Sequence, residues 1–335
     1  MSILDVKEPA APVEPRADDG LLVRVRALGD FRRGGILVPF VALFVVLSIT
    51  SGPFFTKGNL LNILNQQAST LMPAAAGTLV LVAGGLDLSI GATYTLAGVT
   101  AAHFALVTNP ALAIILGVLV GVVVGIVNGL LVTVARINSL IATLATSYVV
   151  NGIAGLATGG NIITDFGKTG FAKFAQSSFL TVQTSTWVMV AVVVALGFVL
   201  ARTTLGRYMY AAGGNAEAAR LAGVRVQLVQ VVAFTLSGTA AALGGVIDAS
   251  RVLSAQSSSG TDLAFTVLAG IVVGGTSILG GSGAVWRSVV GVLFIALIGN
   301  GFDLLNLNAL YETIVLGVLM LAAVGTDAIA RGRQT

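Results

Sequence analysis

Residue types that build many enzyme sites are absent or nearly absent from this sequence. The 335 residues include no cysteine and one histidine, His103. The chain therefore has no disulfide framework, no thiolate metal site and no cysteine nucleophile, and a histidine metal site or a Ser-His-Asp triad is not expected. His103 stands in an apolar run, where a packed or interfacial histidine is a simpler interpretation than a proton relay.

Charged residues are also scarce. They make up 10% of the chain, whereas soluble domains carry about 25%. From residue 34 to residue 135 the only charged side chains are Lys57 and Asp87. Hydrophobic residues reach 56% and the mean hydropathy is +0.97. Because about 20 apolar residues cross a bilayer as a helix, this composition excludes a soluble protein and predicts an all-α, polytopic integral membrane protein.

The apolar segments divide the chain into three regions. Residues 1–35 are polar, lack the features of a signal peptide and are expected to form a cytoplasmic tail, with a short amphipathic helix near residues 21–33. Residues 36–326 are expected to form the transmembrane domain, and residues 327–335 a cytoplasmic C-terminal tail. About ten spans are predicted, at 36–52, 68–86, 88–107, 111–135, 139–157, 185–201, 228–247, 263–281, 284–302 and 307–326.

The basic residues test this topology, because lysine and arginine are retained on the cytoplasmic side of a membrane. With both termini in the cytoplasm, the external segments hold four of the 18 basic residues, which are Lys57, Lys168, Lys173 and Arg251. The other fourteen fall in cytoplasmic segments. This bias favours ten spans and explains the net charge of +4 without a nucleic-acid partner.

The longest cytoplasmic loop, 202–227, contains a compact helix signal. Asn215 is a good N-cap, residues 216–221 are good helix formers, and Gly223 is a typical terminator. A short amphipathic helix under the membrane is therefore predicted. By itself such a helix is either a solvated connector or a docking element for another protein.

Residues 217–223 of this loop resemble a motif of a known family. Glu217-Ala218-Ala219-x3-Gly223 resembles the EAA-x3-G loop with which permease subunits of ATP-binding-cassette importers engage their ATPase, and the wider chain resembles the ribose-type branch. The resemblance extends over residues 40–326. It rests on GGLDLSIG (84–91), VNGLL (127–131), IATLAT (141–146) and GGTSILGGSG (274–283).

The resemblance implies a function for the chain as a permease subunit in the bacterial inner membrane. A periplasmic or lipid-anchored binding protein would deliver a monosaccharide, a second permease subunit, identical or paralogous, would complete the pathway, and two ATP-binding subunits would drive transport. The coupling helix would comprise Asn215, Glu217, Ala218, Ala219, Leu221 and Gly223. The sequence has no G-x4-G-K-[ST] phosphate loop, so the chain is not an enzyme, and ATP and magnesium are expected in the partner.

Polar residues inside the spans are candidates for the translocation pathway, because sugars are bound through hydrogen bonds. Six are favoured: Asp87, Ser89, Asn128, Thr143, Asn151 and Asn300. Weaker candidates are Asn65, Gln66, Thr70, Thr146, Ser237 and Thr239. Such side chains often bond only a neighbouring helix. Asp87 has two interpretations: it caps the next helix, or it marks a break near the pathway.

Three further features concern helix packing, internal symmetry and the external surface. Gly117, Gly121, Gly125 and Gly129 recur every four residues and favour close helix packing over a pore lining. The glycine-rich segment 274–283 resembles 84–91 and suggests an internal repeat. The external loop 158–184 is either a docking surface for the binding protein or a plain exposed loop.

The main alternative is an ion-coupled secondary transporter of a small polar solute. Such a protein normally carries carboxylates or histidines within its membrane helices. Here Asp87, Asp248 and Asp262 fall near span ends, and Glu312 alone is predicted inside a span. The sequence therefore favours an importer subunit, with Glu312 as the residue that keeps the alternative open.

Overall fold

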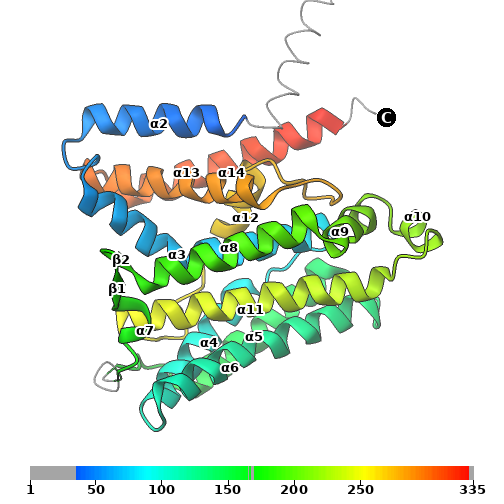
Figure 1. Cartoon of the computed structure of the whole chain (residues 1–335), viewed down its shortest axis with the longest axis horizontal. Helices are drawn as coiled ribbons and strands as arrows, with labels where there is room; N and C mark the ends of the chain where they lie inside the picture. The colour runs from blue at the N-terminus through cyan, green and yellow to red at the C-terminus, as the bar shows by residue number, and fades with distance from the viewer. Residues whose placement is uncertain (1–34, 165, 167–169, 332–335) are drawn as a thin grey trace, which may run out of the picture.

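The computed structural model describes residues 35–164, 166 and 170–331. Within them the chain forms thirteen helices and one small antiparallel hairpin (Figure 1). The helices are α2 (Leu37–Thr50), α3 (Lys57–Val82), α4 (Ile90–Ala105), α5 (Pro110–Thr133), α6 (Ser139–Thr158), α7 (Lys173–Gln176), α8 (Thr184–Arg202), α9 (Thr204–Gly214), α10 (Ala216–Leu221), α11 (Val226–Val252), α12 (Leu263–Val273), α13 (Val285–Leu304) and α14 (Ala309–Arg331), and the strands are β1 (Ser178–Phe179) and β2 (Val182–Gln183). The described part of the chain is therefore mostly helical, as predicted, with one small hairpin. The predicted N-terminal tail, apart from residue 35, lies outside the described residues, as do Lys168 and residues 332–335.

A helix lies at each of the ten predicted spans, but the boundaries of α3 differ from the prediction. The helix begins at Lys57, eleven residues before the predicted start at 68. Thr56 caps it by accepting a hydrogen bond from the amide of Asn59 at 3.3 Å. Its first three turns carry several asparagines and glutamines, so hydropathy alone does not detect them.

The predicted end of α12 is also wrong. The helix stops at Val273 rather than at 281. Gly275 has φ +83, and its amide donates to Val272 O at 2.8 Å. This left-handed turn ends the helix, since glycine adopts positive φ without a steric cost. At the C-terminus, by contrast, α14 continues to Arg331 into the predicted tail.

Five helices, α5, α6, α8, α11 and α13, are long and apolar enough to cross a membrane. Helices α2 and α12 and the first part of α14, to residue 322, are apolar but shorter. These helices make the chain a multi-pass membrane protein. The ten crossings and the side of each terminus remain predictions.

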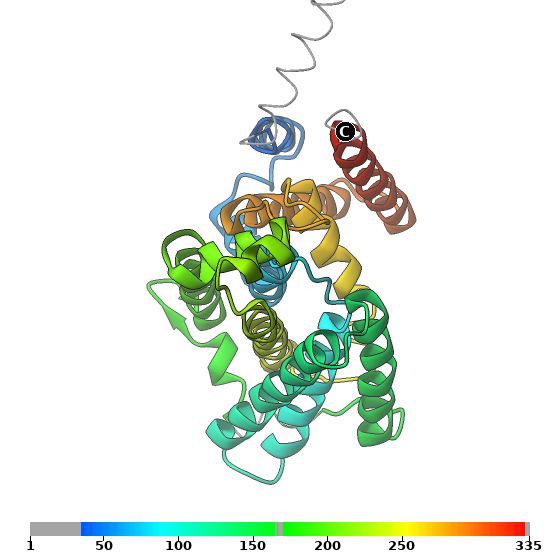
Figure 2. The ribbon, with the colours of Figure 1, turned by 90° about the vertical axis from the view of Figure 1, so that its right-hand side faces the viewer.

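Helix α11 lies at the centre of the bundle and packs against α3, α4 and α5. Viewed end-on (Figure 2), α4, α5 and α6 form one side of the molecule, whereas α12, α13 and α14 form the other. Helix α3 packs against α11 at the centre and against α12 and α13. The hairpin and α7 lie at one end of the bundle and α10 at the other (Figure 1).

The glycine stripe of α5 faces α11, as the packing interpretation predicts. A methyl group built on Gly125 would lie 2.5 Å from Phe234 O, and one on Gly129 would lie 2.8 Å from Val231 Cα. A methyl on Gly121 would collide with Gly238 O. The backbones of the two helices are in direct contact, which small residues make possible in a membrane.

The segment 158–184 is tied to the bundle rather than being a plain exposed loop. Ile163 forms a backbone bridge with Ala255. Ser250 Oγ of α11 donates to Phe171 O at 2.7 Å and accepts from the amide of Ala175 at 3.1 Å. Lys173 begins α7 and is exposed.

Candidate functional site

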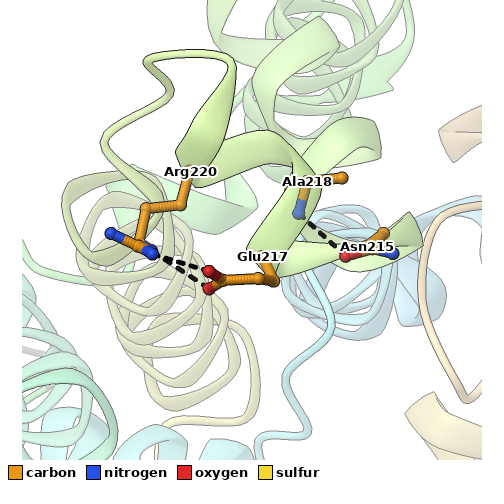
Figure 3. A network of polar contacts seen from close by, with 4 residues as sticks. All are labelled: Asn215, Glu217, Ala218 and Arg220. Atoms are coloured by element: carbon orange, nitrogen blue, oxygen red, sulfur yellow. Dashed lines mark hydrogen bonds and ion pairs between the residues drawn. The ribbon is translucent and has the colours of Figure 1, made fainter.

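The predicted coupling helix is present as α10. Asn215 Oδ1 accepts a hydrogen bond from the amide of Ala218 at 2.9 Å (Figure 3) and caps the first turn. At the other end Gly223 has φ +86, and the amide of Val224 donates to Ala219 O at 3.0 Å. This is the glycine-terminated hydrogen-bond pattern that ends many helices. Both ends of α10 are therefore fixed by local contacts.

The outer face of α10 is open to solvent. Glu217 and Arg220 form an ion pair, with 2.6 Å between Oε1 and Nη2 (Figure 3), and both side chains are more than 60% exposed. The hydrogen bond from Arg220 lowers the pKa of Glu217, so the carboxylate is charged at neutral pH. Leu221 is 75% exposed, whereas Ala219 is buried. The helix thus presents a charged pair beside an exposed leucine at the extreme end of the molecule (Figure 1).

Three backbone segments meet where α9 leads into α10. A methyl group on Gly213, at the end of α9, would collide with Val82 O and would lie 2.7 Å from Gly281 N and 2.9 Å from Gly84 N. The amide of Gly281 donates to Val82 O at 3.0 Å. A methyl on Gly280 would lie 2.9 Å from Gly213 O. We call Gly84, Gly213, Gly280 and Gly281 the glycine junction; it joins the coupling segment to the turns after α3 and α12.

The turn after α3 is held by a buried polar network around Asp87. Its Oδ1 accepts from the amide and the hydroxyl of Ser89 at 2.9 and 2.6 Å, and its Oδ2 accepts from Ser237 Oγ at 2.7 Å. Asn128 Nδ2 donates to Ser89 Oγ at 2.8 Å. Asp87 therefore bonds a backbone amide two residues ahead, as in an Asx turn, while Ser89 is the N-cap residue of α4. Three of the six favoured pathway residues and one weaker candidate, Ser237, lie in this network.

Side chains of α6 hold the backbone of the same turn. Thr143 Oγ1 accepts from the amide of Leu88 at 3.0 Å, and Ser139 Oγ accepts from the amide of Leu86 at 3.1 Å. Thr143 is fully buried. The predicted residues Asp87, Ser89, Asn128 and Thr143 are thus brought together, and each is hydrogen-bonded within the protein.

The turn after α12 repeats the hydrogen-bond pattern of the turn after α3. In the first turn Gly84 N donates to Leu81 O and Gly85 N to Val80 O, each at 2.9 Å. In the second, Gly275 N donates to Val272 O at 2.8 Å and Thr276 N to Ile271 O at 3.2 Å. Gly84 and Gly275, the first donor in each turn, have φ values of +82 and +83. The predicted correspondence between the two glycine-rich segments is therefore present in their geometry.

A second polar cluster supports the turn after α12. Ser288 Oγ accepts from Thr78 Oγ1 at 2.8 Å and lies 3.3 Å from Thr276 Oγ1, and all three side chains are buried. Tyr210 of α9 donates to Gly283 O at 2.8 Å. Hydroxyl groups thus join this turn to both α3 and the coupling segment.

The two remaining favoured residues lie apart from the Asp87 network. Asn300 of α13 exchanges two amide hydrogen bonds with Asn59 of α3, at 2.9 and 3.0 Å. Asn151 is exposed on α6 and makes no side-chain hydrogen bond with the described residues. Of the weaker candidates, Asn65 accepts from Thr186 of α8 at 2.6 Å. Thr146 and Thr239 bond carbonyls of their own helices.

Glu312, the carboxylate that kept an ion-coupled mechanism open, lies in the first turn of α14. Asn308 caps that turn by accepting from the amide of Leu310 at 2.9 Å. An acidic side chain in the first turn is stabilised by the helix dipole. Its position is therefore explained by helix formation, near one end of the span.

Two features were not found from the sequence. One is the glycine junction, whose three segments are at least 67 residues apart in the chain. The other is the ion pair of Asp248 with Arg251, at 2.8 Å on the last turns of α11, beside Tyr94 at a cavity of about 10 Å³. Arg251 Nε is buried without a hydrogen-bond partner in the described part of the chain. The spacing of three residues between Asp248 and Arg251 is the one local signal for this pair.

Comparison with known proteins identifies the family of this chain. Residues 59–324 match the family described as "Branched-chain amino acid transport system / permease component". The chain is 40% identical to the ribose import permease protein RbsC of Bacillus subtilis, over 87% of this chain and 92% of the relative. It is 35% identical to RbsC of Escherichia coli K12 over 87% and 92%, and 35% identical to the L-arabinose transport system permease protein AraH of that strain over 88% and 89%. No solved structure matches the chain. The chain belongs to this family of transport permease components and is a membrane transport subunit rather than an enzyme.

Proposed function

We propose that this chain is the permease subunit of an ATP-driven importer that carries a monosaccharide, with ribose or a similar pentose as the first candidate. The relatives at 40% and 35% identity are named for ribose import, and another is named for L-arabinose transport. Their alignments cover nearly the whole of each chain. Because pentoses are neutral, a pathway with few buried charges suits them.

The observation that carries the proposal is the construction of α10. A helix of six residues is too short to be stable alone in water, yet here both ends are capped and the glycine junction anchors the preceding helix. It exposes Glu217, Arg220 and Leu221 together. An exposed leucine beside a charged pair is a suitable contact for a partner protein. We assign that partner as a separate ATPase subunit, which binds ATP and magnesium.

We propose a membrane topology that agrees with this function. Ten crossings place α10 in the cytoplasm together with both termini and fourteen of the 18 basic residues. The end of the bundle that carries α7 and the hairpin then faces the periplasm. There the described residues of the segment 158–184 form the surface that we assign to the binding protein. In a bacterial cell this arrangement belongs to the inner membrane.

Asn151 indicates where a second permease subunit and the pathway lie. An amide side chain exposed in the middle of a membrane helix is costly if it faces lipid. Methyl groups built on Gly152 and Gly155 meet no described atom within 4 Å, so this face of α6 has room for a close neighbour. We propose that it faces the second permease subunit and the sugar pathway. The Asp87 network and the Asn59–Asn300 pair then act by fixing the helices around that pathway.

Reconstituted uptake tests the function. The chain, its ATPase and its binding protein are placed in proteoliposomes, and radiolabelled ribose, arabinose, hexoses and polyols are compared with ATP or with an ion gradient alone. We expect ATP-dependent uptake of a pentose in the wild type. Glu217→Arg should abolish uptake and copurification of the ATPase, because it replaces the ion pair with two like charges.

Lys57→Glu is the matched control. It also reverses one exposed charge, but it lies at the start of α3, at the opposite end of the molecule from α10 (Figure 1). It should insert into the membrane and bind the ATPase as the wild type does. Uptake that follows the ion gradient and ignores Glu217→Arg would refute the proposal.

The absence of native cysteine gives a direct test of the α6 face. Asn151→Cys should form an oxidative cross-link between permease subunits, or react with a water-soluble thiol reagent if it lines the pathway. Val194→Cys, exposed on α8, is the control for a lipid-facing position. If Asn151→Cys reacted like the control, the face would be lipid-exposed and the assignment would be wrong.

A further inference from the structure

A groove-like cavity lies between α9 and the beginning of α11, beside the coupling helix. Its volume is about 350 Å³, which is within the range of small-ligand sites. The lining residues come from two helix faces and the turn that joins them: Thr204, Leu205, Tyr208, Gly223, Arg225, Leu228, Val229 and Val232. Neither the fold nor the coupling role of α10 accounts for it.

The lining is divided by polarity. Leu205, Leu228 and Val232 supply aliphatic surface, and Leu228 is 55% exposed. Thr204, Tyr208 and Arg225 supply a hydroxyl, a phenol and a guanidinium. A purely polar ligand leaves the aliphatic wall unused, whereas a purely apolar one leaves the cation without a partner. An amphipathic ligand matches both parts.

The cation in this groove has no partner of its own. Arg225 is exposed and makes no side-chain hydrogen bond or ion pair with any residue that the structure describes. The acid of the same loop, Glu217, is already paired with Arg220. Loop 202–227 has four arginines, of which Arg202 and Arg207 are the other two, against this one acid, so the region carries a net charge of +3. The complementary ligand is therefore an anion.

The position of the groove selects the kind of anion. It lies where the apolar helix α11 begins, at the turn 222–225 that carries Arg225. In the proposed orientation this is the depth of the lipid headgroups. Tyrosine is enriched at this depth, and basic pockets between helices on the cytoplasmic side bind anionic headgroups. We propose that the groove binds one anionic phospholipid, with its phosphate on Arg225 and Tyr208 and its acyl chains along Leu205, Leu228 and Val232.

Native mass spectrometry of the purified, delipidated full-length chain tests this site. Phosphatidylglycerol and phosphatidylcholine with identical acyl chains are added separately to the wild type, to Arg225→Gln and to Arg207→Gln. Arg207 is an exposed cation next to Tyr208 on α9 but does not line the groove. The wild type should bind one phosphatidylglycerol about fivefold more tightly than phosphatidylcholine, the effect expected of one basic residue near an anionic headgroup.

The variants separate a specific site from general charge attraction. Arg225→Gln should reduce phosphatidylglycerol binding to the level of phosphatidylcholine, Arg225→Lys should retain most of the preference, and Arg207→Gln should behave as the wild type. Equal loss in Arg225→Gln and Arg207→Gln would overturn the proposal, as would equal binding of the two lipids by the wild type. Displacement of the lipid by glycerol 3-phosphate would identify a simple phosphate site. Displacement by the purified ATPase subunit would identify a protein contact. Either result would overturn the lipid assignment.

Discussion

The glycine junction provides the most stringent test of how the coupling helix is held. Gly213 and Gly214 are neighbours at the end of α9, but they differ completely in their surroundings. A methyl group on Gly213 meets backbone atoms of two other turns, whereas one on Gly214 meets no described atom within 4 Å. Gly213→Ala and Gly214→Ala therefore add the same group to the same helix end, with and without a collision.

The size of the effect follows from the distances. The new methyl at Gly213 would lie 2.7 and 2.9 Å from the two nitrogen atoms, which is shorter than an ordinary contact of about 3.5 Å by roughly 0.6–0.8 Å. Backbone atoms cannot rotate away as a side chain can, so α9 must withdraw. Overpacking of this kind costs about 1–3 kcal/mol. Loss of the hydrogen bond from Gly281 to Val82 adds about 1 kcal/mol. Any gain in helix propensity is shared by both variants, so their difference is about 2–4 kcal/mol.

Thermal unfolding in detergent, followed by sugar uptake, measures this difference. Gly213→Ala should lower the unfolding temperature by about 3–6 °C relative to Gly214→Ala, and its uptake should fall because α10 is displaced. Gly214→Ala should match the wild type in both assays. Equal unfolding temperatures for the two variants would refute the close contact among the three segments.

Three further predictions concern packing, pairing and charge. Gly121→Ala should lower the unfolding free energy by about 1–3 kcal/mol, whereas Gly317→Ala on α14, which has open space, should not; equal effects in denaturant unfolding would contradict the α5–α11 packing. A double-mutant cycle of Asn59→Ala and Asn300→Ala should give a coupling energy of about 0.6–1.7 kcal/mol, and zero coupling would exclude the paired amides. The pKa of Glu217 is lowered from its ordinary value of 4.5, so its ion pair is complete above pH 4.5 and is lost as the pH falls through the lowered pKa. Hydrogen exchange of the α10 amides, corrected for the intrinsic rate, should then be constant from pH 5 to 8 and rise below 4.5; a Glu217→Gln variant that showed the same step would contradict this assignment.

The position of the short helix α10 was predicted almost residue by residue because its signals are local. Asn215 bonds an amide three residues ahead, and Gly223 ends the helix through its own positive φ. Neither contact depends on the rest of the fold. The same holds for the glycine stripe of α5, whose spacing alone places four residues on one face.

The boundaries of α3 and α12 were less predictable because hydropathy measures the environment rather than the hydrogen bonding. The first turns of α3 are polar but are still capped by Thr56. Residues after Val273 are apolar enough to extend a span, yet Gly275 reverses the chain. Backbone conformation at one residue decided each boundary.

The partners of Asp87 could not be predicted from the sequence. Its turn was recognised, and a structural role was weighed against a place near the pathway. However, Ser237 is 150 residues away and Asn128 is on another helix. The sequence identified polar residues within apolar spans, and a hydrogen-bond network selected four of them as a group. Whether a polar side chain in a membrane faces a neighbour or a solute is decided by tertiary packing.

The turns after α3 and α12 are far apart in the sequence but share their hydrogen bonds and their contact with Gly213. Each turn ends its helix with the same two hydrogen bonds, and glycine backbone from each of the two segments lies against Gly213. Contacts between backbone atoms contain no flexible side chain that could absorb a displacement. We therefore expect a displacement of α9 to move both turns, together with the polar clusters of Asp87 and Ser288. The junction thus gives α10 a mechanical connection to both sides of the bundle, which side-chain packing alone would make weaker.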